Sequence, residues 1–319
     1  MTQTDELRWM ARIARLYYEK DMSQAQIANQ LGLSQASVSR MLNKARKEGV
    51  VRISVSVPTG VYSKLEESLI NKYGLRDVII VDTTETDDEN LIMKELGSAA
   101  AYYLESSIKP NEIIGLSSWS DTLLRLVEAM HPVPRKKGIK VVQILGGVGN
   151  PEAEVYSNRM ADRLANLLKG AAVPLPAPGI VGSPATLEVL LQDAYVRTAI
   201  DLFESVSMGL VGIGSVEPSP LLAKSGNIFS EEELQMLRNI GAVGDILLHF
   251  FDKDGNPLES FLNNRVVSMD LPQLSRVDKA IGVAGGNRKF EAILGALRGG
   301  WLNILVTDQH TAKRLVESP

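Results

Sequence analysis

The sequence predicts an α/β protein with an N-terminal helix-turn-helix domain and a larger domain built on a mostly parallel, Rossmann-like sheet. Two patterns predict this: helical periodicity in residues 1–57, and apolar strands that alternate with helices in residues 58–319. The charge supports the division, because the first part carries nine basic and five acidic side chains and the second carries 25 and 33. The net charge of −4 is therefore the sum of +4 and −8, and we place the domain boundary at residue 57.

The composition excludes several classes of protein. The chain has 319 residues and no cysteine, which rules out a disulfide, a thiol nucleophile and a cysteine-ligated metal. No apolar run reaches the roughly 18–20 residues of a membrane span, and the first residues lack the apolar core of a secretory signal. His131, His249 and His310 share no metal-ligand spacing. We therefore expect a soluble cytoplasmic protein with no metal, no cofactor and no membrane partner.

Three short helices are expected in the N-terminal domain. The first is predicted by apolar residues at three- and four-residue steps, namely Leu7, Met10, Ala14 and Tyr17. The second begins after Ser23, which forms a capping-box pattern with Gln26, and it ends at Gly32. The third begins after Ser34 and ends at Gly49. This spacing is typical of a helix-turn-helix motif, whose second helix enters the major groove of DNA.

Polar residues on the outer face of the third helix predict DNA contacts. Val38 and Met41 are expected to face inward. The residues expected to contact DNA are Ser34, Gln35, Ser37, Arg40 and Lys44. Glutamine pairs with adenine and arginine with guanine, whereas lysines further along the helix suit phosphates. The alternative is a helical hairpin with a solvated basic face.

The segment after the third helix contains an alternating stretch and a short helix. Residues 50–57 alternate apolar and polar side chains, which predicts either a wing strand or the first edge of the next domain. A helix is expected over residues 63–72 as a connector. It either pairs with its copy in a dimer or simply packs on the larger domain.

The larger domain repeats strand, loop and helix. Strands are expected at residues 78–81, 112–116, 140–145, 207–211, 279–283 and 303–306. Helices are expected at residues 91–104, 123–130, 158–168 and 290–297 and at the C-terminus. A β-hairpin with its turn at Asp254–Gly255 interrupts the alternation, and Asp245, beside two glycines, is expected to be accessible just before it. Ligands of such sheets bind beyond the carboxyl ends of the strands.

Two loops at those strand ends suit an anionic ligand. The loop SSWSDT crowds hydroxyls at a helix start, and AGGNRK places two glycines before Asn287, Arg288 and Lys289. Backbone N–H groups and a helix N-terminus favour an anion there, although each loop alone also fits a plain tight turn. Trp119 either lines a pocket or belongs to the core. No nucleotide-binding glycine motif or hydrolase elbow is present, and the acidic residues 87–89 are expected to form a solvated loop and helix start.

The chain resembles the SorC family of bacterial sugar-responsive transcription regulators along almost its full length. The resemblance rests on YYEKDMSQAQIANQLGLSQASVSRML, GLSSWSDTL, ILGGVG, LVGIGSVEPSPLL, NIGAVGDILLHFFDKDGNPL, NRVVSMDLPQL, GVAGGNRKFEAILGALRGGWLNILVTD and TAKRL, in that order. It implies a larger domain similar to the sugar-phosphate isomerase/deaminase fold, used as a ligand sensor, and commonly a tetramer.

The same resemblance implies a set of ligand-binding residues. They are Ser117, Ser118, Thr122, Gly146, Gly147, Asp245, Gly286, Asn287 and Lys289. Loop amides and Lys289 would bind a phosphate, and Asp245 would bind a sugar hydroxyl. The family usually has glycine after the tryptophan of the first loop, and Ser120 takes that place here, so an added side chain is expected to change the shape of the pocket or the approach of a phosphate.

The functional expectation is a DNA-binding transcriptional regulator whose operator affinity is controlled by a sugar or sugar phosphate, with the effector and oligomerisation domain at residues 58–319. Its partners would be double-stranded operator DNA, the effector, and copies of the chain in a dimer or tetramer. We expect no catalytic residue. One alternative is a sugar-phosphate isomerase or deaminase fused to a DNA-binding module, and another is a DNA binder that responds to no ligand. Ligand binding would shift the populations of two oligomer arrangements.

Overall fold

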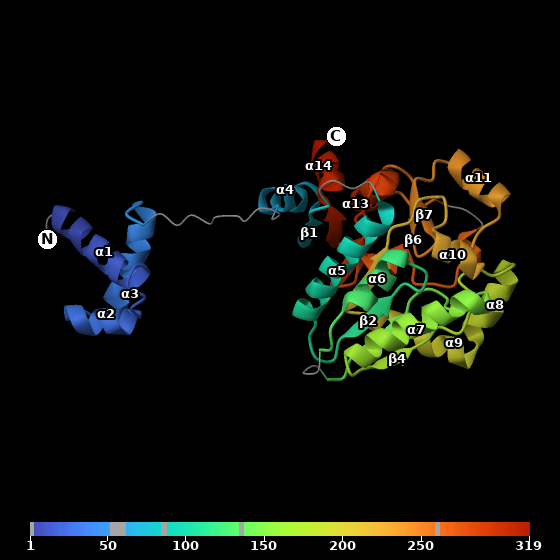
Figure 1. Cartoon of the computed structure of the whole chain (residues 1–319), viewed down its shortest axis with the longest axis horizontal. Coiled ribbons are helices and arrows are strands. Elements are labelled where there is room, and N and C mark those ends of the chain that lie inside the picture. The colour runs from blue at the N-terminus through green and yellow to red at the C-terminus, as the bar shows by residue number, and fades with distance from the viewer. Residues whose placement is uncertain (1–2, 52–61, 84–87, 134–136, 259–261) are drawn as a thin grey trace. The chain divides into compact units, whose positions relative to one another are not determined.

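The computed structural model describes residues 3–51, 62–83, 88–133, 137–258 and 262–319 (Figure 1). Its residues form two compact units, Met1–Pro58 and Thr59–Pro319. The predicted strand at residues 50–57 lies, from residue 52 on, outside the described residues, as does Asp87 of the acidic loop.

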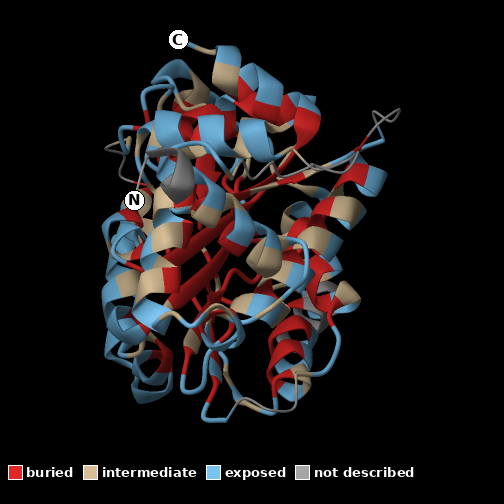
Figure 2. Cartoon of the chain, turned by 90° about the vertical axis from the view of Figure 1, so that its left-hand side faces the viewer, coloured by how far each residue is buried: buried red, intermediate tan, exposed pale blue. Residues whose placement is uncertain are grey.

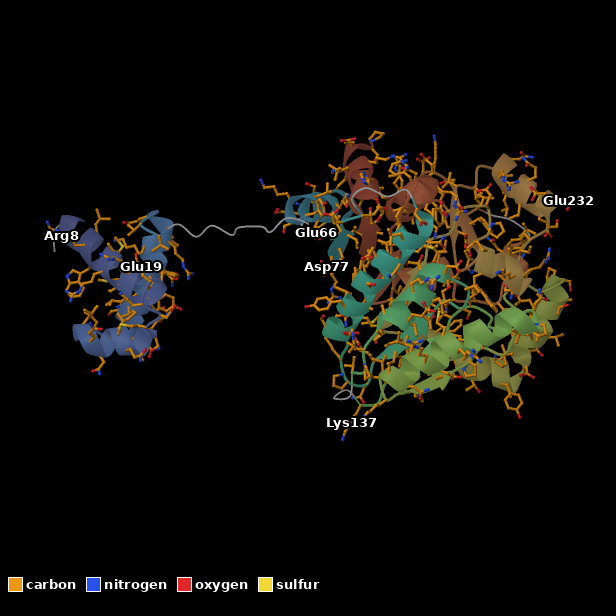
Figure 3. The ribbon with its side chains drawn as sticks, viewed as in Figure 1. Arg8, Glu19, Glu66, Asp77, Lys137 and Glu232 are labelled. Carbon is orange, nitrogen blue, oxygen red and sulfur yellow. The ribbon has the colours of Figure 1, made fainter. Side chains whose placement is uncertain are left out.

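The N-terminal unit contains three helices: α1 (Gln3–Tyr18), α2 (Gln24–Leu31) and α3 (Gln35–Lys47). The predicted capping box is present, since Ser23 accepts from the amide of Gln26 and the Gln26 side chain accepts from the amide of Ser23. Gly32 adopts φ +63°, the left-handed conformation that the turn between α2 and α3 requires. The three helices share a small apolar core of Ile13, Ala14, Ile27, Ala28, Val38 and Leu42. Charged side chains such as Arg8 and Glu19 lie outside it (Figure 3).

The second unit is built on a seven-stranded parallel sheet. Its strands are β1 (Asp77–Val81), β2 (Ile113–Leu116), β3 (Lys140–Gln143), β4 (Ala171–Val173), β5 (Met208–Gly212), β8 (Lys279–Val283) and β9 (Ile304–Asp308). They lie in the order β1-β9-β8-β5-β2-β3-β4. From β2 the chain runs outward to β3 and β4, and from β5 it runs the other way to β8 and β9. The strand order therefore reverses between β2 and β5, which are hydrogen-bonded neighbours.

Helices cover both faces of the sheet, and the buried strands lie between them (Figure 2). One face packs on α5 (Glu89–Ser107), α6 (Asp121–Ala129) and α7 (Pro151–Leu167) through one apolar cluster. The other face packs on α4 (Ser63–Tyr73), α13 (Phe290–Arg298) and α14 (Gln309–Glu317) through a second cluster. Successive strand residues alternate between the clusters, as Ile304 and Leu305 of β9 do.

The connector helix α4 packs inside this unit. Its Leu69 is fully buried, and its C-terminal residues contact α14 (Figure 1). Glu66 accepts a hydrogen bond from the backbone N–H of Ile80 of β1 at 3.1 Å. Because β1 is an edge strand, this carboxylate satisfies an amide that would otherwise face an open edge. The helix α4 therefore packs on the larger domain, which is one of the two roles expected for it.

Several elements escaped the sequence patterns. They are β4, α8 (Pro184–Gln192), α9 (Ala194–Ile200), α10 (Pro220–Ser225), α11 (Glu231–Asn239), α12 (Leu271–Ser275) and three single-turn 3₁₀ helices at residues 203–205, 263–265 and 287–289. Most are short, and α8 buries none of its residues, so no periodic apolar face identifies them. The helix expected at 158–168 in fact begins at Pro151.

The predicted β-hairpin, with its turn at Asp254–Gly255, is preceded by another turn that the sequence did not predict. Strands β6 (Gly244–Ile246) and β7 (His249–Phe251) pair antiparallel around Leu247 and Leu248, which both have positive φ. The expected turn at Gly255 (φ +84°) follows, where Phe251 pairs with Pro257. Two bulky residues in left-handed backbone are unusual, and such strain tends to collect at functional sites.

Candidate functional site

The first candidate surface is the start of α3. Ser34 is its N-cap, and its hydroxyl accepts from the amide of Ser37 at 3.2 Å. Gln35 and Arg40 are exposed, and Arg40 donates to the Ser37 hydroxyl at 3.3 Å. The predicted inward residue Val38 is buried, whereas Met41 is only half-buried. Polar donors are thus presented on the first turns of the second helix of the motif, where base contacts are made in such motifs.

The basic end of α3 is partly occupied by internal contacts. Lys44 forms an ion pair with Glu48 at 3.6 Å, and Arg46 donates to the hydroxyl of Tyr18 at 2.7 Å. Asn43 is exposed one helical turn after Arg40, on the same side of α3.

The second candidate site is a cavity of about 390 Å³ at the carboxyl ends of the strands. Its walls come from the loops after β2, β5 and β8, from the β6–β7 hairpin and from the start of α5. Since β2 and β5 flank the point where the strand order reverses, this is where an open α/β sheet binds its ligand.

The structure brings five of the nine expected ligand residues to this cavity: Ser117, Thr122, Asp245, Gly286 and Lys289. The other four, Ser118, Gly146, Gly147 and Asn287, are not among the described residues that line it. The hydroxyl of Ser118 instead donates to the carbonyl of Leu145 at 2.6 Å. A Cβ at Gly146 or Gly147 would collide with Pro178 or with the amide group of Gln143, respectively, so both glycines serve packing.

Asp245 is a buried carboxyl in the cavity with a raised pKa. The expectation of an accessible carboxylate is wrong, because Asp245 lies within β6 and only 9% of the residue is exposed. Burial raises the pKa of its carboxyl from 3.8 to about 6. Two influences oppose that rise: the backbone N–H of Leu248 donates to Oδ2 at 3.0 Å, and Lys289 supplies positive charge. The unusual backbone at Leu248 thus turns its amide onto the carboxylate. Gly214 lies against the other carboxylate oxygen, leaving no room for a Cβ there.

Lys289 reaches the cavity from the loop after β8. Burial lowers the pKa of its amine, and the neighbouring Arg288 lowers it further, whereas Asp245 and Asp121 raise it. Arg288 forms an ion pair with Glu89 of α5 at 3.3 Å. Lys289 is therefore a partly buried amine near carboxylates, able to bind an anionic group or to donate to oxygen atoms.

Sequence reasoning missed several residues of the cavity. Asp121 directly precedes Thr122, which was expected to bind the ligand. Ser215 lies in the loop after β5; the strand was predicted, but no residue of its loop was expected to bind the ligand. Trp119 was expected either to line a pocket or to belong to the core, and it does both, because it is buried and lines the cavity. Its indole N–H donates to the carbonyl of Gly146 at 2.7 Å. The residues that line the cavity therefore include acidic, basic, hydroxyl-bearing and apolar side chains.

Within the described ranges, no three histidine, aspartate or glutamate side chains cluster closely enough to hold a metal ion. Across those same ranges, no helix is long and apolar enough to cross a membrane.

A helix-turn-helix unit joined to an α/β unit with a ligand-sized cavity at its topological switch point defines a ligand-responsive DNA-binding regulator. The comparisons agree. Residues 7–58 match the Crp-like helix-turn-helix domain, and residues 58–317 match the family described as "Putative sugar-binding domain". The chain belongs to this family of transcription regulators, of which SorC is a member.

Two relatives are similar over nearly their full length. The deoxyribonucleoside regulator of Bacillus subtilis is 35% identical, with 95% of each chain covered. The sorbitol operon regulator of Klebsiella pneumoniae is 30% identical, with 99% of this chain and 100% of that protein covered. The crystal structure of full-length SorC from Klebsiella pneumoniae matches with a TM-score of 0.73, at 29% identity, over 98% of this chain and 99% of that one. The predicted fold class is confirmed.

Proposed function

We propose that this regulator changes its operator affinity when a sugar or sugar phosphate occupies the cavity between the β2, β5 and β8 loops. The observation that supports this most is the meeting of Asp245, Lys289 and the hydroxyls of Ser117 and Thr122 in one cavity. Hydroxyls and a carboxylate suit a polyhydroxyl ligand, and the lysine suits its anionic group. We further propose that the regulator acts in the cytoplasm as a dimer or tetramer and controls a carbohydrate operon. Each chain would divide at residue 57 into its DNA-binding domain and its effector domain.

The proposed contacts divide into two groups. Asp245 would accept from sugar hydroxyls, while Lys289 would bind phosphate or another anionic oxygen. The amide of Gly286 is already engaged, since it donates to Asp308 at 2.7 Å, so Gly286 would line the site without donating to the phosphate. Ser118, Gly146, Gly147 and Asn287 would act from outside the cavity, by holding its loops.

A thermal-shift panel of free and phosphorylated sugars tests the proposal. Because a ligand that binds only the folded state stabilises it by mass action, a member at 100 times its Kd should add about 2.7 kcal/mol to the free energy of unfolding. The panel would include deoxyribose 5-phosphate, ribose 5-phosphate, fructose 6-phosphate, sorbitol and sorbose. A panel in which no compound raises the melting temperature contradicts the sensor function.

Lys289→Ala should lower the affinity for the stabilising compound about 10- to 100-fold, because one charge-assisted hydrogen bond contributes about 1.5–3 kcal/mol. Operator binding without the compound should stay close to that of the parent protein. Calorimetric titration measures the first effect and gel shift the second. Lys253→Ala, which removes an exposed lysine of the hairpin loop, is the matched control. Equal ligand affinity in both variants would remove Lys289 from the site.

Substitutions on α3 should separate base reading from phosphate binding. Arg40→Ala should cost about 1–3 kcal/mol of operator binding and relax the base preference at one position. Lys44→Ala should weaken binding to all sequences and reduce the slope of log affinity against log salt by about one. Salt titrations on operator and scrambled DNA measure both. If Arg40→Ala weakens both DNAs equally, Arg40 is not a base reader.

The raised pKa of Asp245 is the one observation that favours the enzymatic alternative, because a carboxylate titrating near 6 is suited to general base catalysis. Ring opening also needs an acid, and no described histidine lines the cavity: the Nε2 of His249 lies 2.9 Å from the hydroxyl of Ser268. The relatives named above are regulators. Turnover of ribose or hexosamine phosphates by the pure protein would establish catalysis and overturn our proposal of a purely sensory site.

A further inference from the structure

The loop that carries Lys289 is fastened to α14. The buried Asp308, which is the N-cap of α14, accepts from the amides of His310 and Thr311 through Oδ1 at 3.0 and 2.9 Å. Its Oδ2 accepts from the amide of Gly286 and the hydroxyl of Thr311, both at 2.7 Å. A Cβ at Gly285 would collide with this carboxylate. One side chain therefore holds both the helix start and the cavity loop.

A second fastening lies one turn further along α14. The guanidinium of Arg314 donates to Oδ1 of Asn287 at 3.1 Å and stacks over the ring of Phe290, 3.7 Å from its centre. Asn287 and Phe290 flank Arg288 and Lys289 in the chain. A shift of the Lys289 loop on ligand binding would therefore act directly on α14, because two independent contacts connect them.

The other end of α14 is fastened to α4. The ammonium of Lys72 donates to the carbonyls of Leu315, Val316 and Ser318, the first two at 3.1 and 3.0 Å. The hydroxyl of Tyr73 donates to the carbonyl of Leu315 at 2.7 Å. A cation at the last carbonyls of a helix is favoured by the helix dipole. In the chain, α4 is the first described element after the DNA-binding unit.

We propose that α14 couples the effector loop to α4, and through α4 to the DNA-binding unit. Arg314 and Asp308 are the positioning residues at one end, and Lys72 and Tyr73 are those at the other. This inference rests on the proposed function, because it needs a ligand at Lys289. It predicts that Asn287, which does not line the cavity but accepts from Arg314, affects the response to a ligand through α14.

The absence of cysteine allows a direct test on the full chain. A nitroxide label on Asn71→Cys, an exposed position of α4, reports the surroundings of that helix. The probe is whichever compound of the sugar panel gives the largest melting shift. It should change the label spectrum in the parent protein, and the change should fall about fivefold or more in Arg314→Ala and Lys72→Met. Ligand-induced stabilisation should persist in both, and Lys313→Ala, an exposed neighbour on α14, should respond like the parent.

The outcomes separate this proposal from the proposed function. An unchanged spectrum in the ligand-bound parent, or a parental response in Arg314→Ala and Lys72→Met, overturns the coupling and leaves the ligand site standing. Loss of ligand-induced stabilisation in Arg314→Ala and Lys72→Met also overturns the coupling, because the substitutions would then impair ligand binding itself. A panel with no stabilising compound removes the proposed function, and the coupling with it.

Discussion

Asp245→Asn is expected to make the protein more stable and a poorer sensor at the same time. The carboxyl has its pKa raised from 3.8 to about 6 by burial, so at pH 7 the folded state carries a charge that its surroundings disfavour. A difference of this size corresponds to at most about 3 kcal/mol. Asparagine keeps the shape and an oxygen that accepts from Leu248, so most of that cost should disappear at pH 7. Ligand affinity should fall about 10- to 100-fold, because a charged hydrogen-bond acceptor is lost.

The pH dependence of this effect has a definite sign. A raised pKa in the folded state stabilises the parent fully below about pH 4, and this stabilisation is lost as the pH rises through about 6. The advantage of Asp245→Asn should therefore be near zero at pH 4 and grow up to about pH 7. Denaturant unfolding at several pH values measures it, with the exposed Asp254→Asn as the matched control. An advantage that is constant with pH, or that both variants share, would contradict the assignment.

The largest loss of stability is expected from Glu112→Ala. Glu112 and Lys279 form an ion pair at 2.7 Å with only 7% and 4% of the residues exposed, at the amino ends of β2 and β8. The ammonium of Lys279 also donates to the carbonyl of Ser107 at 2.8 Å. Removing the carboxylate leaves a buried, uncompensated cation, which costs about 3–5 kcal/mol out of a typical total of about 5–15.

Neighbouring residues provide the control for this prediction. Asp278, directly before Lys279, pairs with Arg76 at 2.7 Å on the surface, and Asp278→Ala should cost no more than about 1 kcal/mol. The double variant Glu112→Leu, Lys279→Met should recover most of the loss, because well-packed apolar side chains replace a buried pair at little cost. If urea unfolding shows equal losses for Glu112→Ala and Asp278→Ala, the buried pair does not have the effect assigned to it.

The parts predicted from sequence are those with strong local signals. Ser23, Gln26 and Gly32 define α2 through capping and turn chemistry alone, and β8 was predicted to the residue from its apolar run. Strands that lie in the interior of the sheet are apolar on both faces, which makes them easy to recognise. The edge strand β4 has only three residues, none of them fully buried, and it was missed for that reason.

The site was predicted less completely, because its geometry depends on contacts between distant residues. Nothing near Gly286 in the sequence indicates that Asp308 accepts from its amide, or that Ser118 donates to Leu145. The turn at Leu247–Leu248 was equally hidden, since leucine has no preference for left-handed backbone. Residue types at strand ends therefore located the cavity, while the direction of each donor required the folded structure.

Operator binding in the presence of a ligand tests the central claim most directly. A DNA fragment selected from a random pool by the ligand-free full chain would be titrated with and without the panel compound that gives the largest melting shift. We predict a change in operator Kd of about fivefold or more with the parent protein, and the same change with Lys289→Ala only at about 10- to 100-fold higher compound concentrations. An operator Kd that a saturating compound leaves unchanged would contradict the account of this chain as a ligand-responsive regulator.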